Sequence, residues 1–140
     1  RILKKFEGAD KFLPKPIFKQ ETNASSNGLI YFGSTEAAMQ ESLDQLSIAG
    51  FPIDAMRIRS FPFGAEVWDF IDQHERIFLV EQNRDAQMKT LIVSEGSVNP
   101  QKFISILCFD GAPITANFIS ESILEIISEN SISKTAEEMK

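Results

Sequence analysis

Apolar residues along the chain form short continuous runs that alternate with segments of helical spacing. The runs at residues 29–32 and 77–80 are too short for helices, which predicts strands that are covered on both faces. A third strand is expected at 55–59, where apolar and basic residues alternate, and a fourth at 103–109. The alternation at 55–59 indicates one wetter face and a position at the edge of the sheet.

The segment after each strand carries apolar residues at the spacing of a helix with one buried face. These positions are Met39, Leu43 and Leu46; Val67, Phe70 and Ile71; Met88, Leu91 and Ile92; and Ile119, Ile123, Ile126 and Ile127. Ser34 or Thr35, then Asp85, then Thr115 are the expected N-caps of the first, third and fourth helices. Gly50 is expected to end the first helix.

Strands that alternate with helices predict an α/β fold with a mostly parallel sheet and helices on both faces, because right-handed crossovers cover the sheet. Numbered along the chain from the strand at 29–32, the four strands are expected in the core order 2-1-3-4. The segment around Pro16-Ile17-Phe18-Lys19 is expected to add one antiparallel edge strand.

The chain divides into three parts by composition. Residues 1–27 are interpreted as a basic arm and linker, because Pro14 and Pro16 exclude a continuous helix and the segment 22–28 is polar. Residues 28–130 form the expected compact domain, and residues 131–140 the expected flexible tail. Because the first residue is Arg1, we expect the chain to be a piece of a longer protein.

Charge is distributed unevenly along the chain. Net charge is −6, yet the first twenty residues hold six Lys or Arg against two Asp or Glu. Nucleic-acid binding needs clustered cations, and only the six basic residues of the first twenty offer a cluster. A basic arm that packs on neighbouring acidic surface is favoured over that alternative. No nucleic acid is therefore expected as a partner.

Membrane insertion and cysteine chemistry are both disfavoured. No apolar run is long enough to span a bilayer, so no membrane partner is expected. Cys108 is the only cysteine, which excludes an internal disulfide and a cysteine-ligated iron–sulfur cluster within these residues. Its apolar surroundings indicate an inert thiol, and a cytoplasmic location is predicted.

The point where strand order reverses is where open parallel sheets bind ligands. It would bring Gly33-Ser34-Thr35 close to Glu81-Gln82-Asn83, beside two helix N-termini that can hold an anion. However, the sequence contains neither a dinucleotide-binding nor a P-loop glycine motif, and tight turns with caps explain these residues. A structural role is therefore favoured there.

Side chains that often carry catalysis are sparse and isolated. Glu81 and Asp85 are interpreted as salt-bridge or interface residues rather than an acid–base pair. His74, the only histidine, is interpreted as structural near the end of the second helix. No metal-ligand spacing occurs. We therefore predict no catalytic residue and no metal site in the chain.

Apolar residues also occur where the chain should turn. Phe61-Pro62-Phe63 follows the strand at 55–59 and precedes the second helix. Exposed apolar residues at such a turn are typical of contact with a neighbouring domain.

Four stretches in fixed order resemble the C-terminal domain of 2-oxoacid:ferredoxin oxidoreductase alpha subunits, especially the 2-oxoglutarate type. They are residues 29–35 (LIYFGST), 61–63 (FPF), 78–87 (FLVEQNRDAQ) and 109–113 (FDGAP). The resemblance covers about residues 28–127. Its most specific element is V-E-x-N followed by a Gly-Gln pair, in which Ala86 replaces the glycine here.

The resemblance implies a three-layer α/β/α sandwich of the transketolase C-terminal type, packed beside thiamine-diphosphate-binding domains. The whole enzyme would convert a 2-oxoacid and coenzyme A to an acyl-CoA and carbon dioxide, passing electrons through iron–sulfur clusters to ferredoxin. This fragment would bind no thiamine diphosphate, magnesium or cluster and would catalyse nothing alone. Its partners would be the remaining alpha-subunit domains and a beta subunit, with ferredoxin an indirect partner.

Eight residues are the expected interface or site-shaping positions: Gly33, Ser34, Thr35, Phe61, Phe63, Glu81, Asn83 and Gln87. The alternative hypothesis is a free-standing flavodoxin-like or Rossmann-like module that binds a nucleotide or flavin at the switch-point turns.

Overall fold

The computed structural model describes residues 8, 11–19 and 25–140 and has an α/β fold built on one five-stranded sheet. Its strands are β1 (Ile17–Lys19), β2 (Asn27–Phe32), β3 (Asp54–Ile58), β4 (Arg76–Glu81) and β5 (Phe103–Leu107). They lie in the order β1-β3-β2-β4-β5. β2 to β5 are parallel and β1 is antiparallel to β3. The predicted core order and the antiparallel edge strand from the arm are both confirmed.

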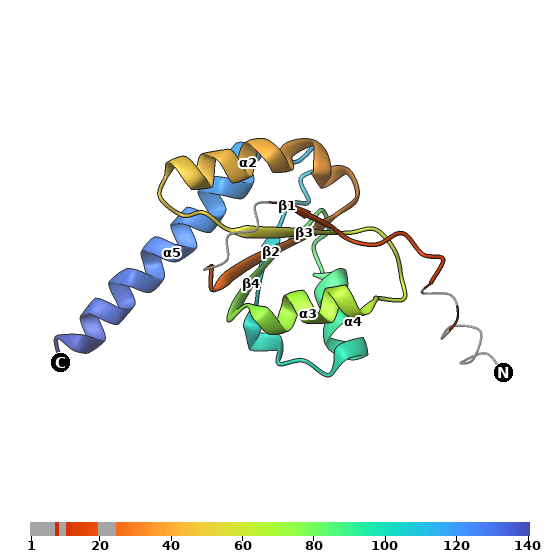
Figure 1. The fold of residues 1–140 in the computed structure, drawn as a ribbon. Helices are drawn as coiled ribbons and strands as arrows, with labels where there is room; N and C mark the ends of the chain where they lie inside the picture. Colours follow the sequence, from red (N-terminus) through yellow and green to blue (C-terminus); the bar gives the residue numbers. More distant parts are fainter. Residues whose placement is uncertain (1–7, 9–10, 20–24) are drawn as a thin grey trace.

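Helices cover both faces of this sheet, as predicted (Figure 1). They are α2 (Glu36–Ile48), α3 (Ala65–Gln73), α4 (Gln87–Gly96) and α5 (Ala116–Glu138), with short 3-10 turns η1 (Gly33–Thr35) and η2 (Pro100–Lys102). α2 and α5 pack on one face, and α3 and α4 pack on the other. The result is a three-layer α/β/α sandwich.

Alternation along each strand divides the core into two apolar layers. Leu29 and Tyr31 of β2 pack toward α2 and α5, whereas Ile30 packs toward α3 and α4. In β4, Phe78 and Leu79 divide in the same way. All five side chains are fully buried, because both faces of a parallel sheet are covered by its crossover helices.

β3 is less exposed than its alternating pattern indicated. It is the outer strand of the parallel set, but β1 pairs along its other side, with Ile17 opposite Arg57. Ala55 and Met56 are fully buried, and only Arg57 of β3 is partly exposed. The predicted edge position of residues 55–59 was therefore wrong, because the arm supplies the edge strand. The predicted wetter face agrees with the partial exposure of Arg57 and the exposure of Arg59.

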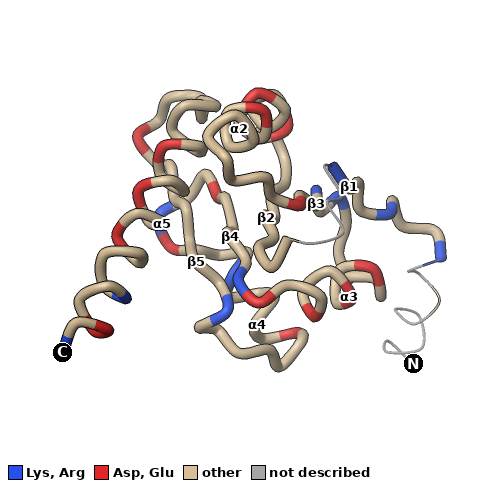
Figure 2. Tube along the Cα trace, turned by 60° about the vertical axis from the view of Figure 1, so that its left-hand side comes forward, with Lys and Arg blue, Asp and Glu red and all other residues tan. Residues whose placement is uncertain are grey.

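The basic arm packs on acidic side chains of the domain, as predicted. Lys19 Nζ lies 2.6 Å from Glu36 Oε1 at the start of α2, and Lys15 Nζ lies 3.1 Å from Glu66 Oε1 at the start of α3. Basic residues follow the arm and β1, while the helices carry most of the acidic ones (Figure 2). The arm is thus held by charge as well as by strand pairing.

α5 is longer than the sequence indicated. Thr115 caps it as predicted, since its Oγ1 accepts a hydrogen bond from Phe118 N at 3.1 Å. The helix continues to Glu138, so residues 131–138 of the expected tail are helical, with exposed side chains. Figure 1 shows this half of α5 reaching beyond the sheet.

Candidate functional site

The expected site residues meet at the carboxyl ends of the parallel strands. Gln82, which follows β4, donates from Nε2 to Ser34 Oγ at 2.8 Å and to Thr35 Oγ1 at 3.1 Å. The predicted proximity of residues 33–35 and 81–83 is therefore correct. The same hydrogen bonds tie the two turns together at the switch point.

Glu81 places a carboxylate at the N-terminus of α4. The residue is fully buried, and its Oε1 accepts hydrogen bonds from Met88 N at 2.6 Å and Asn83 Nδ2 at 3.0 Å. Its Oε2 accepts from Lys89 N at 3.3 Å. The positive end of a helix stabilises such a charge. The backbone amides that an external anion would use are therefore already taken by the protein itself.

The predicted cap of α4 was wrong. Asp85 is exposed and bonds to its neighbour, with Arg84 Nε 2.9 Å from Asp85 Oδ1. Asn83 Oδ1 accepts instead from Gln87 N at 3.2 Å, beside the bonds made by Glu81. The acceptors thus come from the end of β4 and the turn after it, because the chain passes through Ala86 in a left-handed conformation, with φ of 49°.

Ser34 and Thr35 do not cap α2 either. Thr35 occupies the N-cap position but accepts no hydrogen bond there, and both hydroxyls accept from Gln82. Glu36 supplies the negative charge in the first turn. The prediction placed Ser34 and Thr35 correctly at the N-terminus of α2. Their hydroxyls, however, bond to Gln82 and not to the backbone of the helix.

Glu36 is the centre of a polar cluster on the α2 side of the sheet that the sequence did not reveal. Tyr31 Oη donates to Glu36 Oε2 at 2.6 Å, Lys19 Nζ bonds Oε1, and Arg57 Nε lies 3.8 Å from Oε2. Burial would raise the pKa of Glu36, but the bonds from Lys19 and Tyr31 and the charges of Lys19 and Arg57 hold it below its ordinary value. Burial, followed by the bond to Glu36, raises the pKa of Tyr31 well above its ordinary range.

An open pocket of about 540 Å³ lies beyond the ends of β2 and β3, one strand away from the predicted crevice. We call it the carboxyl-edge pocket. It is lined by Pro14, Phe32, Gly33, Arg57, Ile58, Arg59, Ser60, Phe61, Phe63, Met88 and Leu91. It therefore brings three of the expected positions, Gly33, Phe61 and Phe63, to one surface. The other five expected positions surround the α4 turn and the switch point.

The aromatic turn forms one wall of this pocket. Phe61 and Phe63 pack edge to face with ring centroids 5.3 Å apart, and Phe63 packs in the same way on Trp68 at 5.7 Å. Phe61 is 48% exposed, whereas Phe63 and Trp68 are half-buried against the α3–α4 core. Of these three aromatic residues, only Phe61 presents much of its ring to solvent. The Phe61–Pro62 peptide bond is cis.

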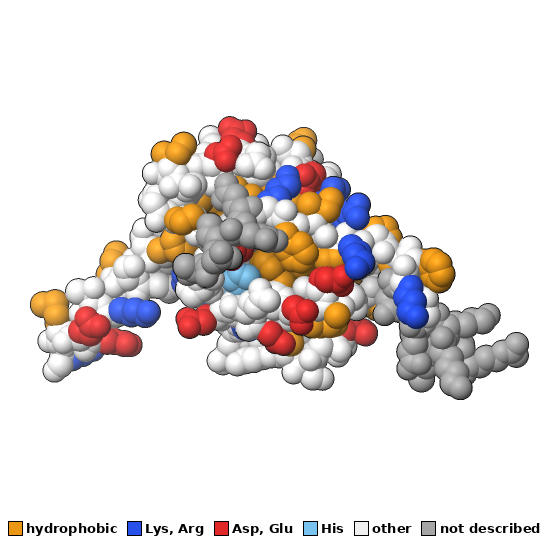
Figure 3. All heavy atoms as spheres, in the orientation of Figure 1, with side chains coloured by type: hydrophobic (Ala, Val, Ile, Leu, Met, Phe, Trp, Pro, Cys, Tyr) orange, Lys and Arg blue, Asp and Glu red, His pale blue; other side chains and the backbone are white. Residues whose placement is uncertain are grey.

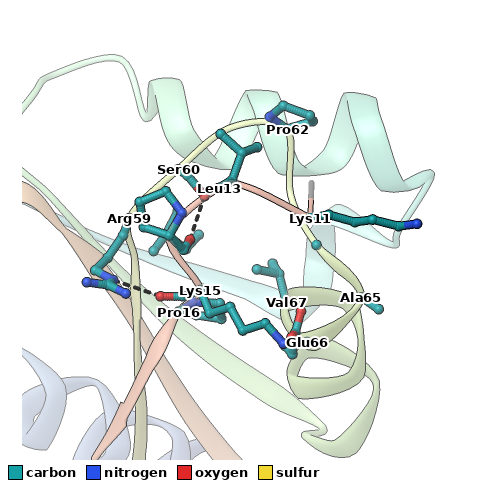
Figure 4. Close-up of a pocket in the computed structure, with 13 residues that line it drawn as sticks. Lys11, Leu13, Lys15, Pro16, Arg59, Ser60, Pro62, Ala65, Glu66 and Val67 are labelled. Atoms are coloured by element: carbon teal, nitrogen blue, oxygen red, sulfur yellow. Dashed lines mark hydrogen bonds and ion pairs between the residues drawn. The ribbon is translucent and has the colours of Figure 1, made fainter. Parts of the chain in front are cut away.

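A second, smaller pocket of about 220 Å³ lies between the arm and the start of α3 (Figure 4). Arg59 Nε donates to Lys15 O at 2.7 Å, and Ser60 Oγ donates to Pro14 O at 2.8 Å. Lys15 pairs with Glu66 across the same gap. The residues around this pocket therefore hold the arm in place beside β3 and the start of α3.

His74 lies at the opposite, amino edge of the sheet and has structural contacts. Its Nδ1 donates to Phe70 O at 2.6 Å, and its Nε2 lies 3.0 Å from Asp54 Oδ2. The ring is 4% exposed and packs on Phe70 at 4.3 Å. This agrees with the structural interpretation of the histidine.

Cys108 lies just after β5 and is partly buried against the α2–α5 core. Its backbone N donates to Glu81 O at 2.9 Å. Within the described ranges, no group of three or more His, Cys, Asp or Glu is placed to hold a metal ion. No helix in the part of the chain that the structure describes is both long and apolar enough to cross a membrane.

Comparison with known proteins connects this fold to one class of enzyme subunit. The chain is 26% identical over 129 residues to the alpha subunit of 2-oxoacid:ferredoxin oxidoreductase 2 from Aeropyrum pernix. That match covers 89% of this chain and 20% of the relative, so the chain spans about a fifth of its length. No protein-family profile matches the chain.

Two solved structures share the fold. The 2-oxoglutarate:ferredoxin oxidoreductase from Magnetococcus marinus, with 2-oxoglutarate, coenzyme A and succinyl-CoA bound, superposes with a TM-score of 0.74 at 22% identity. The match covers 85% of this chain and 21% of that one. The alpha chain of a probable 2-oxoacid ferredoxin oxidoreductase from Thermoplasma acidophilum gives a TM-score of 0.54 at 21% identity, covering 81% and 97%. The resemblance to part of such alpha subunits is confirmed.

Proposed function

We propose that this chain is the C-terminal structural domain of the alpha subunit of a thiamine-diphosphate-dependent 2-oxoacid:ferredoxin oxidoreductase. It would supply scaffold and contact surface, and the reacting groups would come from other parts of the enzyme. The similarity to the Aeropyrum subunit and the fold shared with the Magnetococcus enzyme support this proposal. The parent enzyme would use coenzyme A and ferredoxin and would act in the cytoplasm with a beta subunit.

2-Oxoglutarate is the substrate that we propose for the parent enzyme. The sequence resemblance was strongest to the 2-oxoglutarate type, and the Magnetococcus enzyme is described with 2-oxoglutarate and succinyl-CoA bound. This choice concerns the assembled enzyme and depends on no residue described here.

Glu81 carries the argument for a structural role. A nucleotide-binding module of this topology would present the free amides of a helix N-terminus to a phosphate. In this chain the carboxylate of Glu81 is buried against Met88 N and Lys89 N, and Gln82 bridges the switch point to Ser34. The geometry therefore disfavours the flavodoxin-like or Rossmann-like alternative.

The residues of this chain do not fit the cofactors of the parent enzyme. An iron–sulfur cluster needs several thiolates, and the sequence has one cysteine. The described residues also contain no acidic cluster that suits magnesium. Thiamine diphosphate, magnesium and the clusters would accordingly be held by other domains or subunits.

Two exposed apolar regions are the proposed contact surfaces. Phe61 and Phe109 follow β3 and β5 at the carboxyl edge and are 48% and 61% exposed. Ile17 and Phe18 of the edge strand β1 are each 37% exposed and, as neighbours in a strand, point to opposite faces. Hydrophobic side chains also gather on the surface between α2 and α3 (Figure 3). Large exposed aromatics of this kind favour docking to another domain.

Calorimetry on the purified chain tests the proposal. Titration with thiamine diphosphate and magnesium should give no heat of binding, and the chain should not turn over a 2-oxoacid with coenzyme A. Saturable binding of the cofactor, or turnover by this polypeptide alone, would contradict the structural role.

A further inference from the structure

We propose that the carboxyl-edge pocket is a binding site for a small organic anion, with the apolar body of the ligand against the aromatic wall and its carboxylate or phosphate beside the arginines. The pocket does not use the amides of α4, which Glu81 occupies. The inference therefore goes beyond the scaffold role and can fail without affecting it.

Size and lining suit a small molecule. A volume of about 540 Å³ lies within the range of ligand pockets, which are mostly apolar with a few polar groups. Phe61, Phe63, Met88 and Leu91 supply an aromatic and thioether surface that accepts a ring or an alkyl chain. Gly33, with φ of +63°, has no atom within 4 Å of the position its Cβ would take, so this wall is open.

Charge in the lining has one sign. Arg57 and Arg59 are its charged residues, and no acidic residue lines the pocket, although the chain as a whole carries a net charge of −6. Glu36 pairs with Arg57 from outside the lining and offsets part of its charge, so the excess positive charge lies mainly on Arg59. A guanidinium group binds carboxylate or phosphate in bidentate geometry, which favours an anion. An anion is thus the ligand charge that the pocket fits.

Both arginines keep hydrogen-bonding capacity. Arg57 Nε is shielded from solvent, has no hydrogen-bond partner among the described residues, and lies 3.8 Å from Glu36. Arg59 is exposed and uses its Nε to hold Lys15 O, a bond that fixes the base of its guanidinium beside the pocket. Arg57 Nε faces Glu36 and is closed to solvent, so it holds the guanidinium in place, and an arriving anion would bind the terminal nitrogens of the two arginines.

The position of the carboxyl-edge pocket in the fold is consistent with ligand binding. The pocket lies beyond the carboxyl ends of β2 and β3, beside the switch point between β2 and β4 where open α/β sheets bind ligands. Its rim includes Phe61, one of the proposed contact residues. Docking of another domain onto this edge would close the open side and leave the ligand at a domain interface, a common position for such sites.

Methyl NMR of the purified chain tests the proposal, with 4-phenylbutyrate as the probe. Saturable shifts of the Met88 and Leu91 methyl groups are expected, with a Kd on the order of 1 mM. Met139, which is 83% exposed at the end of α5, provides an internal control that should not shift. Neutral 4-phenylbutyramide should bind at least about tenfold more weakly, because it lacks the charge.

A pair of arginine variants makes the test specific. Arg59→Gln should weaken binding of 4-phenylbutyrate by roughly fivefold or more, whereas Arg59→Lys should keep part of the affinity. Arg84→Gln is the matched control, since Arg84 is exposed, lies outside the pocket lining and pairs with Asp85. It should bind as the unchanged chain does. Circular dichroism would confirm that each variant is folded.

Two further probes identify the anionic group that the pocket prefers. 4-Phenylbutyl phosphate should shift the same methyl groups, and its affinity relative to 4-phenylbutyrate identifies phosphate or carboxylate as the preferred anion. The proposal would be overturned by equal binding of the amide, by identical shifts with inorganic phosphate alone, or by unchanged affinity in Arg59→Gln. An absence of saturable shifts at Met88 and Leu91 would also overturn it.

Discussion

The backbone amide of Met88 lies 2.6 Å from the carboxylate of Glu81, so the end of β4 supplies an acceptor for the first turn of α4. The two residues are seven positions apart, and the chain between them folds back through a tight turn. This contact fixes the helix to the sheet and satisfies amides that a ligand would otherwise use. The stability of the domain should therefore depend on this contact.

Glu81→Ala should destabilise the chain by about 2–3 kcal/mol, because it leaves the amides of Met88 and Lys89 without their acceptor in a partly buried place. Asp85→Ala, at the cap that sequence spacing suggested, should change stability by less than about 0.5 kcal/mol. Urea denaturation of the two variants measures both values. Equal losses would show that Glu81 is not the cap.

Ala86→Gly should stabilise the chain by about 0.5–1 kcal/mol. Ala86 has φ of 49°, a conformation that costs a residue with a Cβ about 1–2 kcal/mol and glycine almost nothing. The greater freedom of glycine in the unfolded chain offsets part of this gain. The backbone angle would also explain a preference for glycine here, the residue that the resemblance implies at this position.

Ala37→Gly, in the first turn of α2, is the control for that substitution, because a helical backbone offers no strain to relieve and the change should cost roughly 0.3–0.5 kcal/mol. The midpoint temperature of thermal unfolding should therefore rise in Ala86→Gly and fall in Ala37→Gly. Destabilisation by both changes would mean that residue 86 is not strained.

The two ion pairs of the arm should differ in strength. Lys19→Gln should cost about 1 kcal/mol, because Lys19 is 20% exposed and its bond to Glu36 is partly buried. Lys15→Gln should cost close to zero, because Lys15 is 78% exposed and its pair with Glu66 is open to solvent. Urea titrations at low and high salt would measure the difference. A larger loss for Lys15→Gln would contradict this order.

Stability should fall in acid through Glu36. Its pKa in the folded chain is below the ordinary value of 4.5, so its contribution is complete above that pH and disappears as the pH falls through the folded pKa. Glu36→Gln should therefore be less stable than the unchanged chain at neutral pH, by about 1 kcal/mol, with the difference shrinking below about pH 4. Urea titrations across this range measure the effect.

Glu41→Gln on the exposed face of the same helix is the control and should show little loss at any pH. A loss for Glu36→Gln that stays constant down to strongly acidic pH would exclude the ionised carboxylate as its cause.

The sheet could be predicted because its signals are local. The runs at 29–32 and 77–80 are apolar on both faces, and that pattern is typical of strands covered on both sides. The crossover rules predict helices on both faces of a parallel sheet, and the short arm strand was expected around its apolar residues. The expected site positions also gathered at one edge, because the ends of parallel strands meet there.

The contacts within the site were not predictable because they depend on how the elements pack and not on sequence spacing. Asp85 has the right spacing for a cap, yet Glu81 competes successfully because β4 and α4 meet at its carboxylate. Arg57 was expected on a wetter strand face, and the pairing with β1 and the charge of Glu36 could not be seen in that pattern. The carboxyl-edge pocket likewise needs segments from four parts of the chain.

The proposed contact surface can be tested separately in the assembled enzyme. Phe61→Asp should weaken association of this domain with the rest of the enzyme, because it places a charge in an aromatic contact. Ile132→Asp is the control, since Ile132 is 71% exposed on the projecting part of α5, outside both proposed contact regions. Equal association of both variants, measured by size-exclusion chromatography of the purified assembly, would exclude the carboxyl edge as the interface.

The most direct test of the account is an activity assay on the native assembly that contains this chain. An affinity tag on the native protein that contains this chain, introduced in the source organism, would allow that assembly to be purified and assayed with 2-oxoacids, coenzyme A and a viologen electron acceptor. The account predicts viologen reduction that requires both the 2-oxoacid and coenzyme A, with none from the purified chain alone. A native assembly that shows no such reduction would contradict it, as would a chain that is active by itself.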